Sequence, residues 1–324
     1  MNIKSGFVQL KNTTISLQEA FDSTFHNKLD FDDFLNLNLT QEYQLLSNEK
    51  VNPSRKLKKY LRFLNSFVFD YAKINTNVVH SYRHEKSTYT AVVPHCNSKF
   101  FFQTDIKDFF HKITKQDVEK ILDTALDNVP IHDIHQYKSE LLNITTIDDI
   151  LPVGFPTSPN ISNSFLSDFD DTLEGYCIKN EIIYTRYSDD IFLSSNTKYS
   201  LMSIQDIISN YLNELYDGRV KINAYKTKHT HKGSKIKILG MVILPSGKIS
   251  VDIKLKQQLE ILFHFYINDK NKFADYLKNH YQGDFSKISG QLNHINTIDK
   301  SYLDKLKKKY GNFIVDSFHH QSID

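Results

Sequence analysis

The chain has 324 residues, of which 40% are hydrophobic, so it is long enough to bury more than one core. A formal net charge of +2 is weak evidence for a polyanionic partner. Two cysteines, Cys96 and Cys177, are too few for a disulfide scaffold and lack metal-ligand spacing, which predicts reduced thiols. Neither a signal-peptide core in residues 1–14 nor an apolar run of about 18 residues is present, so we expect a cytoplasmic protein with no membrane segment.

Helical periodicity predicts several helices in the first two thirds of the chain. They are residues 16–46 with mixed periodicity, 54–72, 114–143 with a break near Pro130, and 200–216. The helix at 54–72 is marked by Pro53-Ser54, a favourable helix start, and by leucines at helical spacing. Residues 153–180 open as a loop rich in Gly, Pro and Ser and become helical from about Pro159.

Strands are predicted where β-branched and aromatic residues gather. Residues 99–110 begin as a strand and end in a turn, and residues 181–195 form a hairpin whose arms flank two acids. Residues 236–251 form a strand, a Pro-Ser-Gly turn and a second strand. After Asp252 the pattern is helical with little glycine, so we place a domain boundary near that residue. The helices expected beyond it are about 254–267, 271–281, 286–295 and 299–310.

The stretch RYSDDIFLSS (186–195) places two adjacent acids, Asp189 and Asp190, inside an apolar run. Burying such charges costs several kcal/mol unless a cation offsets them, so the pair lies either in a solvated turn or beside a metal. A second apolar strand, FFFQTD, also ends in an acid, Asp105. Strands that end in carboxylates side by side in one sheet form an oxygen-only site, which suits Mg²⁺ or Mn²⁺. Two such ions about 3.5–4 Å apart support in-line nucleotidyl transfer, the chemistry that this pattern indicates.

Basic residues gather in two of the expected helices, RKLKKYLR at 55–62 and KLKKK at 305–309, each with aromatic residues nearby. A solvated helix face and a contact with a nucleic-acid backbone both explain such a cluster. Composition alone leaves that choice open.

Five segments resemble, in order, the motifs of reverse transcriptases. TDIKDFF (104–110) resembles motif A, LPVGFPTSPNISN (151–163) motif B, YSDD (187–190) motif C, NAYKT (223–227) motif D and LGMVI (239–243) motif E. Three further segments are similar to fingers and thumb segments of retron-type enzymes, namely PSRKLK (53–58), SYRHEKS (81–87) and DKSYLDKLKKKYG (299–311). A lone Tyr-x-Asp-Asp would be weak evidence, whereas five ordered motifs spread over most of the chain are specific.

The resemblance implies an α+β right-hand polymerase with fingers, a palm built on an antiparallel sheet, and a helical thumb. The implied boundaries are an N-terminal region and fingers at 1–100, palm motif A at 101–111, fingers and palm helices at 112–150, palm motifs B to E at 151–252, and the thumb at 253–324.

The resemblance also implies a catalytic centre. Carried over by motif, Asp105 and Asp189 hold two Mg²⁺ ions, with Mn²⁺ as an alternative, together with the Ile106 carbonyl. Asp190 completes the acidic cluster. Lys226 matches the motif D lysine, which would protonate the leaving pyrophosphate or stabilise its charge, although a plain surface lysine explains it too.

Phe110 holds the position of a steric gate, where a bulky ring would exclude a ribose 2′-OH; ordinary core packing is the alternative. Gly154 would allow close backbone approach, and Asn163 is also explained as an ordinary polar helix residue. The residues implied to shape the dNTP pocket are Phe109, Phe110, Val153, Gly154, Ser158 and Asn163. The residues implied to contact template, primer or triphosphate are Arg55, Lys56, Lys58, Arg83, Leu239, Gly240, Met241, Lys305 and Lys308.

The chain departs from the family pattern at several points. Val153 stands where motif B usually has Gln, so we expect nucleotide selection or template use to differ. The basic strand before PSR offers only Lys50, Ile238-Leu239-Gly240 replaces the retron Val-Thr-Gly, and no Asn-Ala-x-x-His element is evident between motifs A and B. The chain therefore resembles the defence-associated and abortive-infection reverse transcriptases of bacteria more than retron enzymes proper.

These resemblances predict an RNA-directed DNA polymerase that copies a dedicated non-coding RNA into DNA from dNTPs, in bacterial antiviral defence. A protein partner or a homo-oligomer is compatible with the sequence. Template-independent or protein-templated DNA synthesis is an alternative that Val153 motivates. A catalytically silent RNA-binding scaffold is another, which the three intact acids oppose. The defence role rests on family analogy rather than on the site.

Overall fold

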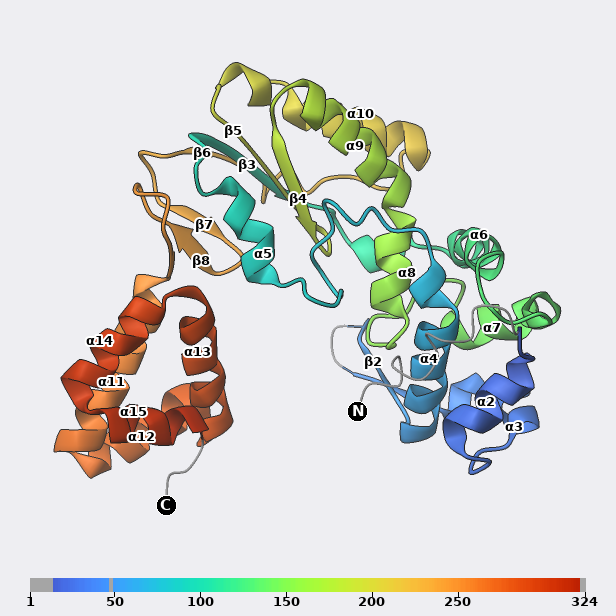
Figure 1. Ribbon diagram of the computed structural model, residues 1–324, viewed down its shortest axis with the longest axis horizontal. Helices are drawn as coiled ribbons and strands as arrows, with labels where there is room; N and C mark the ends of the chain where they lie inside the picture. The colour runs from blue at the N-terminus through green and yellow to red at the C-terminus, as the bar shows by residue number, and fades with distance from the viewer. Residues whose placement is uncertain (1–13, 47–48, 321–324) are drawn as a thin grey trace.

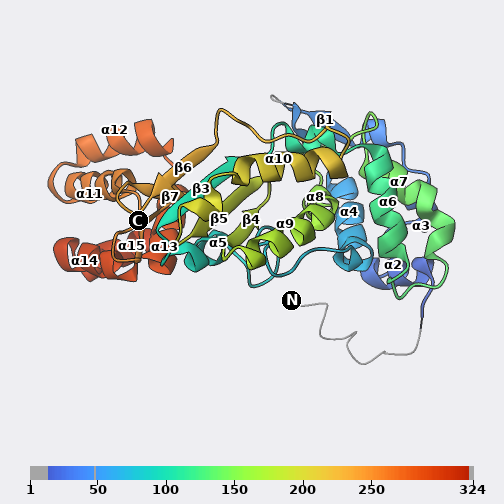
Figure 2. The same ribbon diagram turned by 90° about the horizontal axis from the view of Figure 1, so that it is seen from above.

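The computed structural model describes residues 14–46 and 49–320, and it has three parts in a row (Figure 1). Helices of the first half of the chain lie at one end, an antiparallel sheet with its own helices lies in the middle, and C-terminal helices lie at the other end; the view from above shows the same order (Figure 2). This arrangement agrees with the predicted α+β class. In the described ranges, no helix combines the length and the apolar character needed to cross a bilayer. The signal-peptide prediction concerns residues that lie, apart from Thr14, outside those ranges.

The first part is built on an aromatic core. Its helices are α2 (Leu17–Phe25), α3 (Phe31–Leu35), α4 (Arg55–Phe67), α6 (Lys115–Leu126) and α7 (Lys138–Thr145). The Phe21 ring lies 5.1 Å from that of Phe34 and 5.5 Å from that of Phe63, measured between centroids, so three helices meet at one residue. A small hairpin of β1 (Tyr43–Leu45) and β2 (Val51–Pro53) precedes α4. This hairpin was not predicted from the sequence, because its strands are only three residues long.

The central sheet has the strand order β4-β5-β3-β6, and each neighbouring pair is antiparallel. Its strands are β3 (Phe100–Asp105), β4 (Ile183–Tyr187), β5 (Asp190–Ser195) and β6 (Lys228–His231). Side chains alternate between two cores, as the period of a strand requires. Phe102 and Leu193 join the core shared with the first part, whereas Phe101 and Phe192 join the core shared with the C-terminal helices.

Helices α9 (Ser167–Lys179) and α10 (Ile204–Leu215) lie on one side of the sheet, and the short α5 (Thr88–Val92) lies on the other (Figure 1, Figure 2). The helix predicted from about Pro159 is two helices, because α8 (Ser158–Phe165) ends at Phe165 and α9 begins at Ser167, with Leu166 between them. The prediction for 54–72 was too long, since α4 ends at Phe67. The short 3₁₀ helices are Leu39–Gln41, Phe69–Tyr71, Val93–His95, Phe109–Lys112, Ile134–Tyr137 and Tyr199–Leu201.

A three-stranded sheet replaces the two strands predicted for 236–251. Its strands are β7 (Ile236–Ile238), β8 (Met241–Ile243) and β9 (Ile249–Val251). Leu239 and Gly240, with φ of 49° and 82°, form a two-residue turn within the segment that the sequence predicts to be one strand. Leucine is rare at positive φ, so this turn lacks the sequence signal that usually marks a tight hairpin.

The C-terminal part contains α11 (Ile253–Asn268), α12 (Lys270–Tyr281), α13 (Phe285–Ile298), α14 (Lys300–Tyr310) and α15 (Asn312–His320). An aspartate caps the start of each of the first four, accepting a backbone N–H two or three residues ahead; the four are Asp252, Asp269, Asp284 and Asp299. Helix α15 was not predicted. These helices share a core with the three-stranded sheet, where Met241 and Leu259 are both fully buried.

Candidate active site

The two strands that end in carboxylates are neighbours in the central sheet. In the register of β3 and β5, Asp105 is the direct partner of Asp190. The N–H of Ile106 donates to the carbonyl of Asp189 at 3.1 Å, which continues the ladder one step past the strand ends. The structure therefore brings together the three acids that the sequence analysis selected.

Asp189 lies in a two-residue turn between β4 and β5, because Tyr187 pairs directly with Asp190. Ser188, the first residue of this turn, has a φ of 58°, a conformation that is unfavourable for a residue other than glycine. Such a backbone costs about 1–3 kcal/mol and persists only where its surroundings enforce it. The turn that carries Asp189 is therefore held in place by contacts outside itself.

The carboxylates of Asp105, Asp189 and Asp190 concentrate negative charge where β3 ends and β5 begins, and burial shields Asp189 and Asp190 partly from water. Burial, followed by the neighbouring carboxylates of Asp189 and Asp105, raises the pKa of Asp190 to about 6. Burial also raises the pKa of Asp189. A nearby cation would reverse both shifts, since it favours the charged form of each carboxylate.

Lys226 supplies one positive charge to this cluster. Its Nζ lies 2.9 Å from Oδ2 of Asp105, while its side chain remains 69% exposed. The loop that carries it is fixed because the N–H of Asn223 donates to the carbonyl of Asp105 at 2.7 Å. The hydrogen bond with Asp105 raises the pKa of Lys226, so its amine is protonated at neutral pH.

The donor set fits a divalent cation. Oδ1 of Asp105 is buried and has no hydrogen-bond partner within the described part of the chain. A buried carboxylate oxygen without a partner is costly unless a ligand satisfies it. The neighbouring donors are all oxygens, which is the chemistry that Mg²⁺ and Mn²⁺ prefer.

Phe110 lies five residues after Asp105, in the 3₁₀ turn that follows β3. It is half-buried, whereas Phe109 is buried and lies 6.3 Å from the Phe165 ring, centroid to centroid. The two phenylalanines are therefore differently placed. Phe109 anchors the turn in the core, and part of Phe110 remains accessible.

The motif B loop packs against β2 rather than standing free. The carbonyl of Val153 accepts the N–H of Val51 at 2.8 Å. Gly154 has a φ of 118°, and a Cβ there would lie 2.1 Å from the Val51 carbonyl oxygen, so only glycine fits. The Ser158 hydroxyl donates to the Pro152 carbonyl at 2.6 Å. Gly154 does permit a close backbone approach, and the backbone that it meets is that of Val51.

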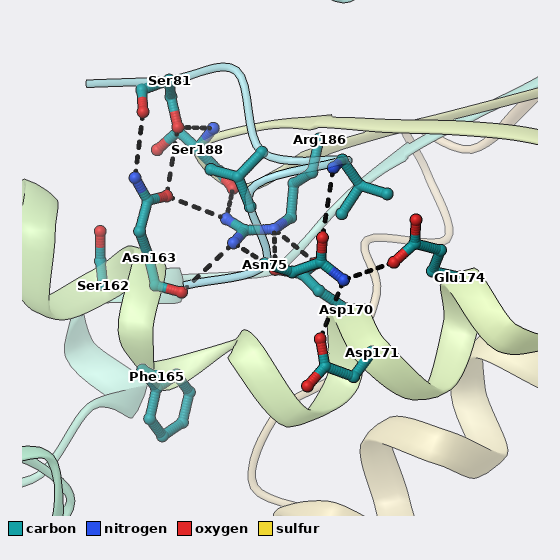
Figure 3. A network of polar contacts seen from close by, with 12 residues as sticks. Asn75, Ser81, Ser162, Asn163, Phe165, Asp170, Asp171, Glu174, Arg186 and Ser188 are labelled. Carbon is teal, nitrogen blue, oxygen red and sulfur yellow. Dashed lines mark hydrogen bonds and ion pairs between the residues drawn. The ribbon is translucent and has the colours of Figure 1, made fainter. Parts of the chain in front are cut away.

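Asn163 is fully buried and makes its side-chain hydrogen bonds inside the protein (Figure 3). Its amide nitrogen donates to the Ser81 carbonyl at 3.0 Å, and its amide oxygen accepts from Arg186 Nη1 at 3.2 Å. Arg186 forms a fully buried ion pair with Asp170, with Nη2 at 2.6 Å from Oδ2. Neither member of this pair is among the site residues predicted from the sequence. An arginine in the apolar arm before Asp189 was the available signal.

The predicted nucleic-acid contacts are spread over the molecule. Lys56 pairs with Asp33 at 3.0 Å and with Glu42 at 3.2 Å, whereas Arg55 beside it is exposed. The Lys58 amine donates to the Asn52 side chain at 2.8 Å. These contacts give Lys56 and Lys58 a role in holding α4, and they leave Arg55 as the more accessible cation.

Arg83 is used to order its own loop, since its Nη1 donates to the carbonyls of Thr76 at 2.8 Å and Val79 at 3.0 Å. Met241, the first residue of β8, is fully buried, and the Leu239-Gly240 turn beside it is partly exposed. The two lysines selected on α14, Lys305 and Lys308, are both exposed.

Three curated relatives are similar over long alignments. The chain is 28% identical over 270 residues to the retron Ec73 reverse transcriptase of Escherichia coli, covering 80% of this chain and 81% of the relative. It is 26% identical over 266 residues to the retron Ec86 reverse transcriptase of Escherichia coli, with coverages of 80% and 76%. The retron Mx162 reverse transcriptase of Myxococcus xanthus is 23% identical over 216 residues, with coverages of 61% and 44%. The similarity thus extends to retron enzymes despite the departures in motifs B and E.

Among solved structures, a telomerase from Candida tropicalis truncated from its C-terminal domain aligns with a TM-score of 0.41 and 13% identity, covering 78% of this chain and 51% of that one. A foamy viral protease-reverse transcriptase in complex with double-stranded DNA aligns with a TM-score of 0.39 and 16% identity, covering 74% and 38%. The chain spans about half of the first structure and less of the second.

The model of the family described as reverse transcriptase (RNA-dependent DNA polymerase) matches residues 41–243, which is more than half of the chain. The matched segment contains the β3–β5 carboxylates, the motif B loop and Lys226. The chain therefore belongs to the reverse transcriptase family, the RNA-directed DNA polymerases.

Proposed function

We propose that this RNA-directed DNA polymerase performs nucleotidyl transfer at the centre formed by Asp105, Asp189 and Asp190. The observation that carries the proposal is the pairing of Asp105 with Asp190 in the sheet, with Asp189 in the turn beside them. Asp105 at the end of β3, Asp190 at the start of β5 and Asp189 in the turn before β5 lie close together, and one buried oxygen of Asp105 has no protein partner among the described residues. Such an arrangement is unfavourable unless it binds a cation.

Mg²⁺ fits these donors, and Mn²⁺ is the alternative. Asp105 and Asp189 would hold two ions together with the carbonyl of Ile106, and Asp190 would add negative charge beside them. When bound, the ions would supply an activated primer hydroxyl and charge stabilisation for the leaving pyrophosphate.

Lys226 is proposed to act on the leaving group. The support for this role is that its protonated amine lies beside Asp105 and that its side chain is mostly exposed. From there it would donate a proton to pyrophosphate or stabilise its charge.

Phe110 is proposed to select dNTPs. Its ring is partly accessible in the turn after β3, whereas Phe109 beside it is buried. A ring at that place would collide with a ribose 2′-OH and leave a deoxyribose unhindered.

The template is proposed to be a dedicated non-coding RNA. The support is the similarity to retron enzymes over most of the chain, together with the exposed cations Arg55, Lys305 and Lys308, which suit a phosphate backbone.

A role in antiviral defence is proposed from the sequence resemblance alone, and a cytoplasmic location stays a prediction of the sequence. Comparing phage plaque formation on bacteria that express the wild type or the Asp189→Ala variant tests the defence role.

The test of the catalytic centre is extension of a primed RNA template with dNTPs and Mg²⁺. Asp189→Ala is expected to lose extension, whereas Asp206→Asn, which removes an exposed carboxylate of α10, is expected to keep it. Equal extension by wild type and Asp189→Ala would remove the catalytic assignment.

A further inference from the structure

The backbone N–H and the backbone carbonyl of Ser188, the strained residue of the turn, are each held by a side chain outside the turn. The N–H of Ser188 donates to Oγ of Ser81 at 2.8 Å. The carbonyl of Ser188 accepts from Nη1 of Arg186 at 2.7 Å. Ser188 is the residue with positive φ that immediately precedes Asp189, so these two bonds act on the backbone that carries the proposed catalytic carboxylate.

Asn163 joins the two holding groups to one another (Figure 3). Its Oδ1 accepts from Oγ of Ser81 at 3.2 Å and from Nη1 of Arg186, also at 3.2 Å. Its Nδ2 donates to the carbonyl of Ser81 at 3.0 Å. None of these three side chains is exposed to solvent, so water cannot substitute readily for a lost partner.

Asp170 fixes the orientation of Arg186 from the opposite side. Nε of Arg186 lies 2.8 Å from Oδ1 of Asp170, and Nη2 lies 2.6 Å from Oδ2. This two-point contact uses the planar fork of the guanidinium and leaves Nη1 directed at the turn. The hydroxyl of Tyr184 donates to Oδ1 of Asp170 at 2.6 Å, at the far end of the network from Ser188.

Ser81 is in place because its segment lies along the edge of β4. The N–H of Arg186 donates to the carbonyl of Val78 at 2.8 Å, and the N–H of His80 donates to the carbonyl of Arg186 at 2.9 Å. Arg83 ties this segment together through the carbonyls of Thr76 and Val79. The segment before α5, helix α8 and strand β4 therefore converge on one turn.

We propose that Arg186, Asn163 and Ser81 are positioning residues that enforce the left-handed backbone of Ser188 and so set the direction of the Asp189 carboxylate. This inference rests on the catalytic role proposed for Asp189. It assigns Asn163 to the catalytic turn rather than to the floor of the nucleotide pocket, because its amide contacts Ser81 and Arg186. Relaxation of Ser188 would rotate the next residue, Asp189, away from Asp105.

The test measures kcat, the KM for dNTP and the Mg²⁺ concentration at half-maximal rate. Arg186→Lys keeps the charge beside Asp170 and removes the guanidinium fork. Ser81→Ala removes the acceptor for the Ser188 N–H together with the hydroxyl that donates to Oδ1 of Asn163. Both variants are expected to lower kcat by roughly 10- to 100-fold, the scale of a small misplacement of a reacting group. The half-saturating Mg²⁺ concentration should rise, and the KM for dNTP should stay at the wild-type value.

Tyr184→Phe is the matched control. It removes one hydrogen bond to Asp170 and leaves the bonds to Ser188 in place, so it should lower the unfolding temperature and keep kcat. A wild-type kcat in folded Arg186→Lys and Ser81→Ala would overturn the proposal. A fall in kcat for Tyr184→Phe as large as for Arg186→Lys would also overturn it, because it would indicate general destabilisation.

Asn163→Ala separates the two assignments of that residue. A lower kcat with unchanged KM for dNTP supports positioning of the turn, whereas a higher KM with unchanged kcat returns Asn163 to the nucleotide pocket and overturns the proposal.

Asp189→Asn distinguishes a failure of the positioning proposal from a failure of the proposed catalytic centre. If Asp189→Asn is inactive while Arg186→Lys is fully active, positioning alone is wrong; if Asp189→Asn is fully active, the catalytic centre itself is wrong.

Discussion

Asp105 and Asp190 are direct partners in the antiparallel register of β3 and β5, although they lie far apart in the sequence. Two like charges facing one another at the end of a sheet repel unless something compensates them. Lys226 supplies part of that compensation through its contact with Asp105. The remaining charge is the physical basis for assigning a divalent cation to this end of the sheet.

The accessible ring of Phe110 leads to a prediction about sugar selection. Phe110→Ala should admit ribonucleotides, because it removes the bulk that would meet a 2′-OH. We expect the ratio of rNTP to dNTP incorporation to rise by at least about tenfold, the effect of removing a clash worth about 1.4 kcal/mol. Phe110→Tyr keeps the ring and should keep the preference for dNTPs. Unchanged ribonucleotide incorporation by Phe110→Ala would refute the gate.

Val153 leads to a prediction about the template. Reactions without added RNA, sequenced at the product level, should contain no extended DNA, because an RNA-directed enzyme needs a strand to copy. Homopolymer or short-repeat products would instead support the template-independent reaction.

Val153→Gln adds a side chain that can hydrogen-bond near the sugar of a bound nucleotide, and it should lower the KM for dNTP.

Gly154 leads to a prediction about stability. Gly154→Ala should destabilise the protein by about 1–3 kcal/mol, because it strains a positive φ and drives a Cβ into the Val51 carbonyl. Gly175→Ala is the control, since Gly175 lies within α9 and a Cβ there meets nothing within 4 Å. That change should stabilise by roughly 0.5–1 kcal/mol. Denaturant unfolding measures both, and equal effects of the two changes would contradict the close approach.

His95 leads to a prediction about pH. It is fully buried between the hydroxyls of Ser194 at 2.7 Å and Thr185 at 2.8 Å. Burial lowers its pKa to about 3, below the usual value near 6.5, so the unfolded chain binds a proton that the folded chain excludes. Stability should therefore be complete above about pH 6.5 and fall as the pH drops, by roughly 2 kcal/mol at pH 5.

His95→Gln should flatten that dependence of unfolding free energy on pH, whatever it does to stability at neutral pH. His264→Gln, which changes an exposed histidine, should leave the slope as in the wild type. An unchanged slope in His95→Gln would show that other groups cause the loss of stability in acid.

The convergence of Asp105, Asp189 and Asp190 could be predicted because it depends on strand ends, which local patterns of apolar residues and acids reveal. The order of the motifs also pointed correctly to the family. The β7–β8 turn could not be predicted, since it places Leu239 at a φ that leucine rarely adopts.

The buried pair of Arg186 and Asp170 is a different kind of omission. Each residue looks ordinary in its own segment, and the pair exists only because α9 packs beside β4. The contacts of Asn163 also depend on tertiary structure, because its partner Ser81 comes from a loop far away in the sequence. Sequence patterns identify residues that carry charge at the end of a strand, whereas the residues that hold them in place are defined by tertiary contacts.

The most direct measurement of the central claim is Mn²⁺ binding followed by electron paramagnetic resonance, with a primer–template whose primer cannot be extended and with a matching dNTP. The wild type and Asp206→Asn should bind the same number of Mn²⁺ ions. Asp105→Asn and Asp189→Asn should each lose bound Mn²⁺, because both carboxylates serve one shared centre. Binding by Asp105→Asn that equals the wild type in number and affinity would contradict the account.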